Sequence, residues 1–201
     1  MAFHLETIME APVTYIEGFA TDLSYDDLNE AIRWEDRGVP RSEAYYADRM
    51  APYTYGSGAY ARTYLPHVDW SDRLAELRAR TEAHCGQAFE LLFCNRYIDD
   101  HQHLGWHADD SPSVDDARPI PVISFGSARE IWFRENGKGE VQKLLLAPGS
   151  LLIMHAGMQR THQHRIPKAG RIVTPRISLT FRGLSPAAAA ELEEGEALAS
   201  A

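Results

Sequence analysis

The sequence predicts an α+β fold in which two helices precede a run of short strands. Apolar residues recur at helical spacing in two N-terminal segments, each with a serine in the position of a helix N-cap. From residue 88 onward, short apolar or alternating segments are separated by turn residues such as Asn136-Gly137. A chain of 201 residues with 44% hydrophobic residues can bury one core, so we expect a single domain over residues 1–184.

The N-terminal elements are expected in the order strand, helix, helix. A short apolar strand falls near residues 12–16, and the first helix spans 24–34, where Leu28 and Ile32 share a face. The second helix lies within 67–85 and ends at a glycine.

The second half of the chain is expected to form the sheets. Strands or extended segments are expected over residues 88–97, 121–125, 128–134, 141–146, 151–154, 159–167 and 176–182. Residues 185–201 form an acidic tail rich in Ala and Glu, with no aromatic residue to anchor it. We interpret this tail as disordered or as a loose helix without a site.

Charge and cysteine content limit the classes of protein to consider. The net charge of −9 argues against strong non-specific binding to long nucleic acid, which depends on many Lys and Arg contacts to phosphates. No apolar run approaches the roughly 20 residues of a membrane span, and residues 1–20 lack the pattern of a secretory signal. Cys85 and Cys94 are expected to be buried thiols. We therefore expect a cytoplasmic monomer that does not bind membranes.

A histidine and a carboxylate stand two residues apart in His107-Ala108-Asp109. In an extended backbone, residues i and i+2 project to the same face roughly 6–7 Å apart, so both can bind one cation. A second histidine from a distant strand would complete the 2-His-1-carboxylate site of non-haem Fe(II) oxygenases, which leaves positions open for substrate and O2. His162 and His164 are in phase with each other, so periodicity leaves both as candidates. Alone, the triplet is more typical of a surface loop.

The expected strand at 176–182 alternates strictly between two faces. One face carries Ile177, Leu179 and Phe181, and the other carries Arg176, Ser178, Thr180 and Arg182. Guanidinium groups match the geometry of carboxylates, so the second face indicates an anion site. The alternative is an edge strand with a solvated basic face.

Six motifs follow one another between residues 95 and 182. They are N-R-Y (95–97), H-A-D (107–109), P-I-P-V-I-S-F-G (119–126), P-G-S-L-L-I-M (148–154), H-R-I-P (164–167) and P-R-I-S-L-T-F-R (175–182). In this order and spacing the sequence resembles the AlkB family of alkylation-repair dioxygenases. The resemblance implies a double-stranded β-helix (jelly-roll) core supported by the two N-terminal helices. It also implies Fe(II), 2-oxoglutarate and O2, and oxidative removal of N-alkyl groups from nucleobases in DNA or RNA, with release of formaldehyde, succinate and CO2.

The resemblance assigns the metal ligands. The family's third ligand lies three residues before a proline, which selects His164 to join His107 and Asp109. The remaining histidines are then expected to lie in the core, beside the ligands or near the substrate: His101, His103, His155 and His162.

The resemblance also assigns the 2-oxoglutarate contacts. Arg176 is expected to pair with the distal carboxylate, aided by Tyr97, whereas Asn95 and Arg182 are expected near the iron-bound end. Ser178 lies on the same strand face as the two arginines.

Residues 38–62 are rich in tyrosine, glycine and proline, and the resemblance places the substrate-recognition lid here. Exposed tyrosines that can stack on a flat base are expected at Tyr45, Tyr46, Tyr53, Tyr55 and Tyr60. The alternative is a pair of ordinary hairpin strands with half-buried tyrosines. The resemblance favours base contacts from Tyr53 and Tyr55, and then from Tyr46 and Arg41. The expected partner is alkylated DNA or RNA with a single-stranded or flipped-out base.

The polar loop 110–117 contains a departure from the family pattern. Related enzymes usually carry an acidic residue at the position of Ser111, where it helps to read the flipped base. Asp110, or the pair Asp115-Asp116, is the candidate to replace it, and a solvated turn is the alternative.

Two other functions compete with nucleobase repair. The acidic charge and Ser111 favour the same oxygenase chemistry on a protein side chain or a lipid. A catalytically silent metal-binding β-barrel module is the second alternative, and the complete triad and both arginines argue against it.

Overall fold

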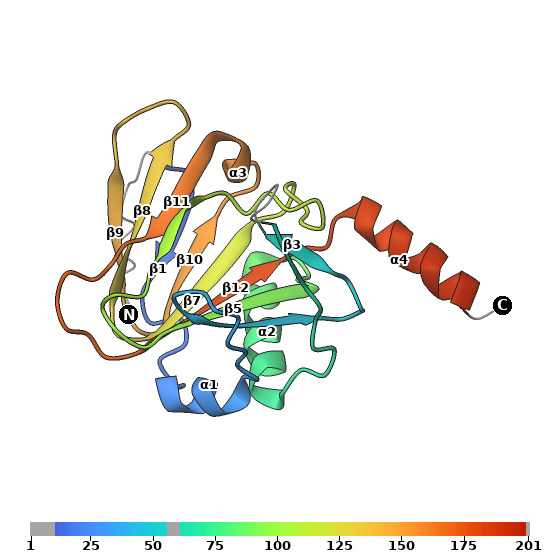
Figure 1. The fold of residues 1–201 in the computed structure, drawn as a ribbon, viewed down its shortest axis with the longest axis horizontal. Coiled ribbons are helices and arrows are strands. Elements are labelled where there is room, and N and C mark those ends of the chain that lie inside the picture. The colour runs from blue at the N-terminus through green and yellow to red at the C-terminus, as the bar shows by residue number, and fades with distance from the viewer. Residues whose placement is uncertain (1–10, 56–60, 200–201) are drawn as a thin grey trace.

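The computed structural model describes residues 11–55 and 61–199, which form two packed antiparallel sheets, a small hairpin and four helices. The larger sheet has the order β1 (Val13–Ile16), β10 (Ser150–Met154), β7 (Ile120–Gly126), β12 (Arg176–Arg182), β5 (Leu91–Tyr97) and β2 (Ser42–Ala47). The smaller sheet has the order β6 (Leu104–His107), β11 (His162–Ile166), β8 (Arg129–Glu135) and β9 (Gln142–Leu146). The two sheets face each other (Figure 1), which confirms the jelly-roll core.

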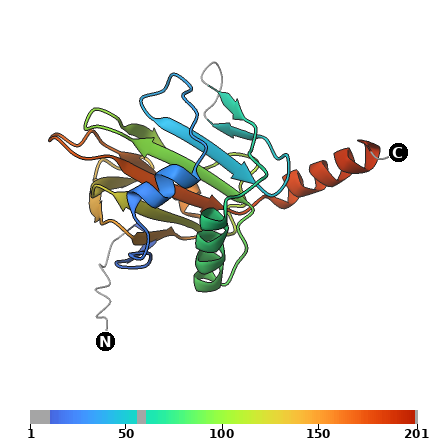
Figure 2. The ribbon, with the colours of Figure 1, turned by 90° about the horizontal axis from the view of Figure 1, so that it is seen from below.

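Two helices, α1 (Tyr25–Ala31) and α2 (Asp72–Cys85), support the larger sheet on its outer face (Figure 2). The side chain of Ser24 caps α1, as the sequence predicts, and forms a capping box with Asp27. Ser71 is at the N-cap of α2 as expected, but its side chain forms no capping hydrogen bond. Leu28 of α1 and Leu74 and Leu77 of α2 are fully buried in a cluster with the outer-face residues of the sheet. This packing fixes the larger sheet as one rigid wall of the fold.

Strand β12 lies in the middle of the larger sheet, between β7 and β5. Its apolar residues Ile177, Leu179 and Phe181 pack in the cluster beneath the helices. The opposite residues therefore project into the space between the sheets, as the alternation predicts. The alternative of an edge strand with a solvated basic face is wrong, because all seven residues of β12 are buried.

The expected lid contributes β2 to the larger sheet and forms the hairpin β3 (Tyr53–Tyr55) and β4 (Arg62–Tyr64). The expectation that its tyrosines are exposed is wrong for Tyr45, Tyr46 and Tyr53, which are only 2%, 1% and 1% exposed. These rings are buried because β2 pairs along β5 and the hairpin packs Tyr53 against Phe93. Of Tyr45, Tyr46, Tyr53 and Tyr55, only Tyr55 is half-buried. Tyr60 lies outside the described residues.

The acidic tail is a helix, α4 (Pro186–Ala199), so the helical alternative is the correct one. The helix projects from the body of the domain (Figure 1), but Leu192 packs against the core and Glu193 pairs with Arg49 at 3.6 Å. A short turn, α3 (Met158–Thr161), precedes β11 in the segment where the sequence predicts only extended chain. None of the described helices has the length and apolar composition that a membrane span requires.

Candidate metal centre and anion pocket

His107, Asp109 and His164 lie close together. The two histidines are on strands of the smaller sheet, and Asp109 is in the loop that follows β6. His107 ends β6, and His164 lies opposite it on the neighbouring strand β11, so the imidazole ring centroids are 4.1 Å apart. The Asp109 carboxylate lies 3.7 Å from Nε2 of His107. One ligand atom from each of the three residues lies within 4.8 Å of the others. Two nitrogens and one oxygen therefore lie on one side of a single point, and the other side of that point remains open.

The hydrogen bonds orient these side chains toward that point. Nδ1 of His107 donates to the carbonyl oxygen of Gly105 at 2.9 Å, which leaves Nε2 as the free lone pair in a neutral ring. One Asp109 oxygen, Oδ2, accepts from Nη2 of Arg182 at 2.8 Å. Oδ1 of Asp109 and Nδ1 of His164 are buried and have no hydrogen-bond partner among the described residues. Buried polar atoms are rarely left unsatisfied, and a cation at this point would satisfy Oδ1 of Asp109.

The charges of the three groups suit a divalent cation. Burial of the His164 imidazole, and then the neighbouring His107, lower the pKa of His164 to about 3. Burial also lowers the pKa of His107. Burial opposes ionisation of Asp109, but Arg182 and the two imidazoles outweigh it and lower the pKa of the carboxyl to about 2. The site therefore presents two neutral imidazoles and one carboxylate at neutral pH, which are the forms that bind a metal.

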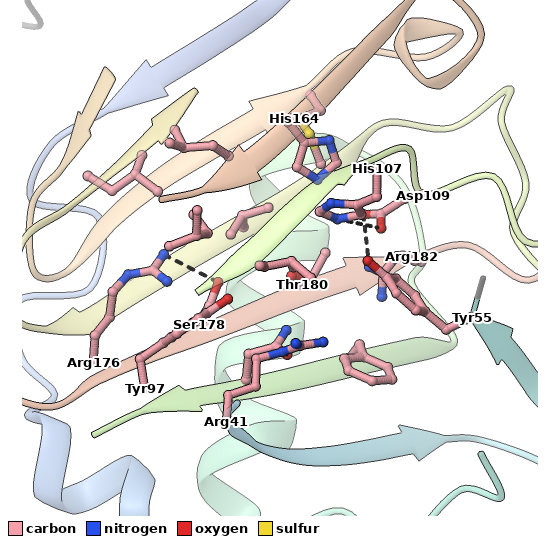
Figure 3. Close-up of a pocket in the computed structure, with 18 residues that line it drawn as sticks. Arg41, Tyr55, Tyr97, His107, Asp109, His164, Arg176, Ser178, Thr180 and Arg182 are labelled. Carbon is pink, nitrogen blue, oxygen red and sulfur yellow. Dashed lines mark hydrogen bonds and ion pairs between the residues drawn. The ribbon is translucent and has the colours of Figure 1, made fainter. Parts of the chain in front are cut away.

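A pocket between the sheets runs from this triad to Arg176 (Figure 3). Arg176 is 0% exposed, and its Nη2 donates to the hydroxyl groups of Ser124 at 2.8 Å and Ser178 at 3.4 Å. Its Nε and Nη1 have no hydrogen-bond partner among the described residues. Burial lowers the pKa of the guanidinium to about 10, so the group remains charged at neutral pH. A buried guanidinium with two unsatisfied nitrogens and no carboxylate partner among the described residues can bind a carboxylate of a ligand.

The remaining residues predicted to bind 2-oxoglutarate line the same pocket. The Tyr97 ring centroid is 5.5 Å from the Arg176 guanidinium carbon, and Ser178 and Thr180 lie between Arg176 and Arg182 on β12. Oδ1 of Asn95 accepts from Nε of Arg41 at 2.6 Å. The metal centre at one end and a guanidinium group at the other fit a small dicarboxylate that spans them.

Arg41 is a wall residue of this pocket. It is 8% exposed and forms an ion pair with Glu43, which is itself fully buried and accepts from the hydroxyl of Tyr64 at 2.7 Å. The structure therefore places Arg41 in the pocket wall beside Asn95, whereas the sequence analysis expected it to contact the base from the lid.

The predicted base-contacting tyrosines occupy three different environments. The Tyr55 ring lies 5.7 Å from the ring of His107 and lines the pocket mouth. The Tyr53 ring lies behind it, 5.3 Å from the Arg182 guanidinium carbon. Tyr46 belongs to the cluster beneath the helices, where its hydroxyl accepts from the backbone nitrogen of Arg33 at 2.8 Å. Tyr46 is therefore separated from the pocket by the sheet, because β2 turns its side chain to the outer face.

A second groove continues outward from Tyr53 and Tyr55 and includes Asp110 and Ser111. Asp110 is exposed, whereas Ser111 is 8% exposed and its hydroxyl has no hydrogen-bond partner among the described residues. The pair Asp115-Asp116 does not reach this groove. Instead these carboxylates form ion pairs with Arg118 and Arg160, which hold the loop to the body of the domain.

Sequence reasoning missed Arg129 and Gln159. Arg129 is 2% exposed, its guanidinium lies 5.5 Å from the Tyr97 ring centroid, and it donates to the carbonyl groups of Gln102 and Pro167. Arg129 lies two residues before Ile131, so both side chains point to the inner face of the strand. This alternation could have indicated that Arg129 is buried. The side chain of Gln159 accepts from the backbone nitrogen of Asp109 at 2.9 Å, and no sequence pattern points to it.

The facial arrangement of two histidines and one carboxylate defines the class of site as that of non-haem iron oxygenases. Residues 24–182 match the model of the 2OG-Fe(II) oxygenase superfamily. The chain therefore belongs to the 2OG-Fe(II) oxygenase superfamily. As in that superfamily, Fe(II) and 2-oxoglutarate are the cofactor and co-substrate, and the triad and the unpaired Arg176 fit both.

Individual relatives agree with the AlkB resemblance drawn from the motifs. The human alpha-ketoglutarate-dependent dioxygenase alkB homolog 3 is 33% identical over 190 residues, which cover 86% of this chain and 64% of the relative. The DNA oxidative demethylase ALKBH2 of Bos taurus is 35% identical over 156 residues, which cover 74% of this chain and 54% of the relative. The solved structure of OsALKBH1 shares the fold, with a TM-score of 0.62, 15% identity, and coverage of 89% of this chain and 99% of that one. The chain spans less than two thirds of the length of these two curated relatives.

Proposed function

We propose that this protein is an Fe(II)- and 2-oxoglutarate-dependent dioxygenase that removes N-alkyl groups from nucleobases in DNA or RNA. The single observation that carries the oxygenase assignment is the buried, unpaired Arg176 in one pocket with an open His–Asp–His triad. The AlkB-type relatives support the substrate class.

The residues of the chain have separate tasks in this reaction. His107, Asp109 and His164 would hold Fe(II), and Arg176 would pair with the distal carboxylate of 2-oxoglutarate while Tyr97 packs beside it. When bound, the iron and its co-substrate would supply the oxidising chemistry, and a hydroxylated N-methyl group would then leave as formaldehyde. The chain contributes position and exclusion of water, because the pocket lies between two sheets.

The groove outside the triad supports a flat, polar substrate. Tyr55 forms one wall beside His107, and Asp110 and Ser111 form the polar end. A base in this groove must be unpaired or flipped out of a duplex, since its alkylated edge has to reach the metal. Single-stranded or weakly paired sites are therefore the proposed substrates.

A second candidate keeps the chemistry and changes the substrate to a protein side chain or a lipid. The net charge of −9 favours it, since phosphate binding depends on cations. Succinate production with and without methylated oligonucleotides separates the two candidates. Stimulation by oligonucleotides supports base repair, whereas the absence of stimulation on every methylated strand contradicts it.

A further inference from the structure

The outer face of the smaller sheet carries an unusual set of side chains, which we call the cation–aromatic face: Trp106, Trp132, Arg134, Lys143 and Arg165. The alternation of the strands turns these residues away from the core, because their neighbours His107, Phe133, Leu144 and His164 face inward. The smaller sheet is the one that α1 and α2 do not cover (Figures 1 and 2). The cation–aromatic face is therefore open to solvent on the back of the strands that carry the metal ligands.

The cations on this face are held by the two tryptophans. The Arg165 guanidinium carbon lies 5.0 Å from the ring centroid of Trp132 and 5.5 Å from that of Trp106. The Arg134 guanidinium carbon is 4.3 Å from the Trp106 ring, and Nζ of Lys143 is 4.4 Å from the Trp132 ring. Such stacking fixes a cation without neutralising it. Nε and Nη2 of Arg134 also donate to Oε1 of Gln163, at 3.0 and 2.5 Å, which holds this guanidinium in place.

Among the described residues these three cations have no carboxylate partner, a property that they share with the exposed Arg62 and Arg171. Elsewhere the surface arginines are mostly paired, as Arg33 is with Asp69 and Arg80 is with Asp22. Within residues 11–55 and 61–199, none of the three cations of the cation–aromatic face forms an ion pair. Nε of Arg165 also has no hydrogen-bond partner in this part of the chain. The carboxylate of Glu130 lies on the same outward face of β8, where it accepts from Nε1 of Trp132 at 2.8 Å. The face therefore carries three cations and one carboxylate in a chain with a net charge of −9.

The position of the face connects it to the proposed substrate groove. Trp106 lies on β6, the edge strand of the smaller sheet, immediately before His107. The chain then runs through Asp109 into the groove lined by Asp110 and Tyr55. Strands lie about 4.8 Å apart, so β6 to β9 spans roughly 14 Å. A substrate strand that leaves the groove across the edge strand β6 would therefore pass over the cation–aromatic face.

We propose that the cation–aromatic face binds the phosphodiester backbone of the substrate strand next to the alkylated base. This inference rests on the proposed function and adds a second contact region to it. Fixed, unpaired cations match phosphates, and a narrow stripe rather than a broad basic surface is consistent with a strongly acidic protein. Short substrates that end inside the groove do not reach this face.

The test compares two double variants that remove the same charge. Lys143→Gln with Arg165→Gln removes two cations from the face. Arg33→Gln with Arg73→Gln is the control, because both side chains are at least half exposed and lie beside the helices of the other sheet. Both variants and the wild type are assayed with an N1-methyladenine trinucleotide and with a single-stranded 20-mer that carries the same base.

We expect the KM of the face variant for the 20-mer to rise roughly tenfold at low salt. The slope of its salt dependence should fall by about one unit for each phosphate that the variant no longer binds. Its kcat and its KM for the trinucleotide should match the wild type, and the control should match on both substrates. An unchanged KM for the 20-mer, or an equal rise for the trinucleotide or in the control, would overturn the proposal.

Binding of a fluorescent, unmethylated 20-mer, measured by anisotropy, tests the face without turnover. Weaker binding by the face variant alone supports the proposal, even if the wild type repairs no methylated strand and the proposed function fails. If polyglutamate competes as well as the unlabelled 20-mer does, the face recognises acidic proteins and the proposal is wrong.

Discussion

Nη2 of Arg182 donates to Oδ2 of Asp109 at 2.8 Å, and it does so from a strand of the opposite sheet. This bond fixes the carboxylate so that Oδ1 is directed to the two imidazoles. The same contact raises the pKa of the Arg182 guanidinium, since the effect of Asp109 outweighs burial. Arg182 therefore belongs to the metal centre as a positioning residue, in addition to its place on the wall of the anion pocket.

Removal of this bond should weaken the metal site. We expect Arg182→Met to lower metal affinity by about 10- to 100-fold, because residues that orient metal ligands typically contribute that much. Titration with Mn(II) by calorimetry measures the effect without oxidation. Arg182→Lys should recover part of the affinity. Wild-type affinity in Arg182→Met, with an intact fold, would show that Asp109 needs no orienting partner.

Substitution of the two in-phase histidines should give opposite results. His164→Ala removes a buried ring from the triad and should abolish both metal retention and turnover. His162→Ala should retain the metal, because its Nδ1 contacts the hydroxyl of Thr161 at 2.8 Å instead. Metal content after reconstitution decides between them. Loss of iron in His162→Ala and retention in His164→Ala would contradict the ligand assignment.

Arg176→Ala should leave the metal in place and weaken 2-oxoglutarate binding at least about thirtyfold. Loss of one member of a buried charge pair typically costs roughly 2–5 kcal/mol of binding free energy. Calorimetry with 2-oxoglutarate and the Mn(II)-loaded protein provides the measurement. Arg96→Ala is the matched control, since Arg96 is a half-buried arginine that stacks on Trp34 at the outer face of the same sheet. Equal affinity in Arg176→Ala and the control would exclude Arg176 from the anion site.

The two tyrosines of the hairpin should respond differently to truncation. Tyr55→Ala should raise the KM for a methylated oligonucleotide about tenfold, because base–aromatic stacking is worth roughly 1–3 kcal/mol per ring. Uncoupled turnover of 2-oxoglutarate should be nearly unchanged. Tyr53→Ala should instead lower the free energy of unfolding by about 3–5 kcal/mol, since its ring is buried. Thermal denaturation and steady-state kinetics separate these effects, and wild-type kinetics in Tyr55→Ala would exclude a base contact.

The sequence predicts the parts of the site that depend on strand alternation. The positions of Arg176 and Arg182 on one face, and of His107 and Asp109 two residues apart, follow from the period of an extended chain. Alternation could not choose between His162 and His164, because both have the same phase. The choice needs the register of β11 against β6, which pairs His164 with His107 and is a tertiary property.

The lid tyrosines were the least predictable residues. Tyr45 and Tyr46 are neighbours on β2, yet one faces the core between the sheets and the other faces the helices. Composition alone could not show that β2 joins the larger sheet and that both faces of this strand are buried. For the same reason, the burial of Arg129 and Glu43 depends on Pro167 and Tyr64, partners that are distant in the sequence.

The most direct test of the central claim is a turnover assay with Fe(II), 2-oxoglutarate and O2 on single-stranded oligonucleotides. The substrates contain N1-methyladenine or N3-methylcytosine, in DNA and in RNA, and Asp109→Ala serves as the inactive control. We predict that at least one substrate yields formaldehyde and the unmodified base in equal amounts and raises succinate production above its level without oligonucleotide, and that the control yields none of the three. Succinate production by the wild type that no methylated oligonucleotide increases, with no base restored, would contradict the assignment of this protein as a nucleobase dealkylase.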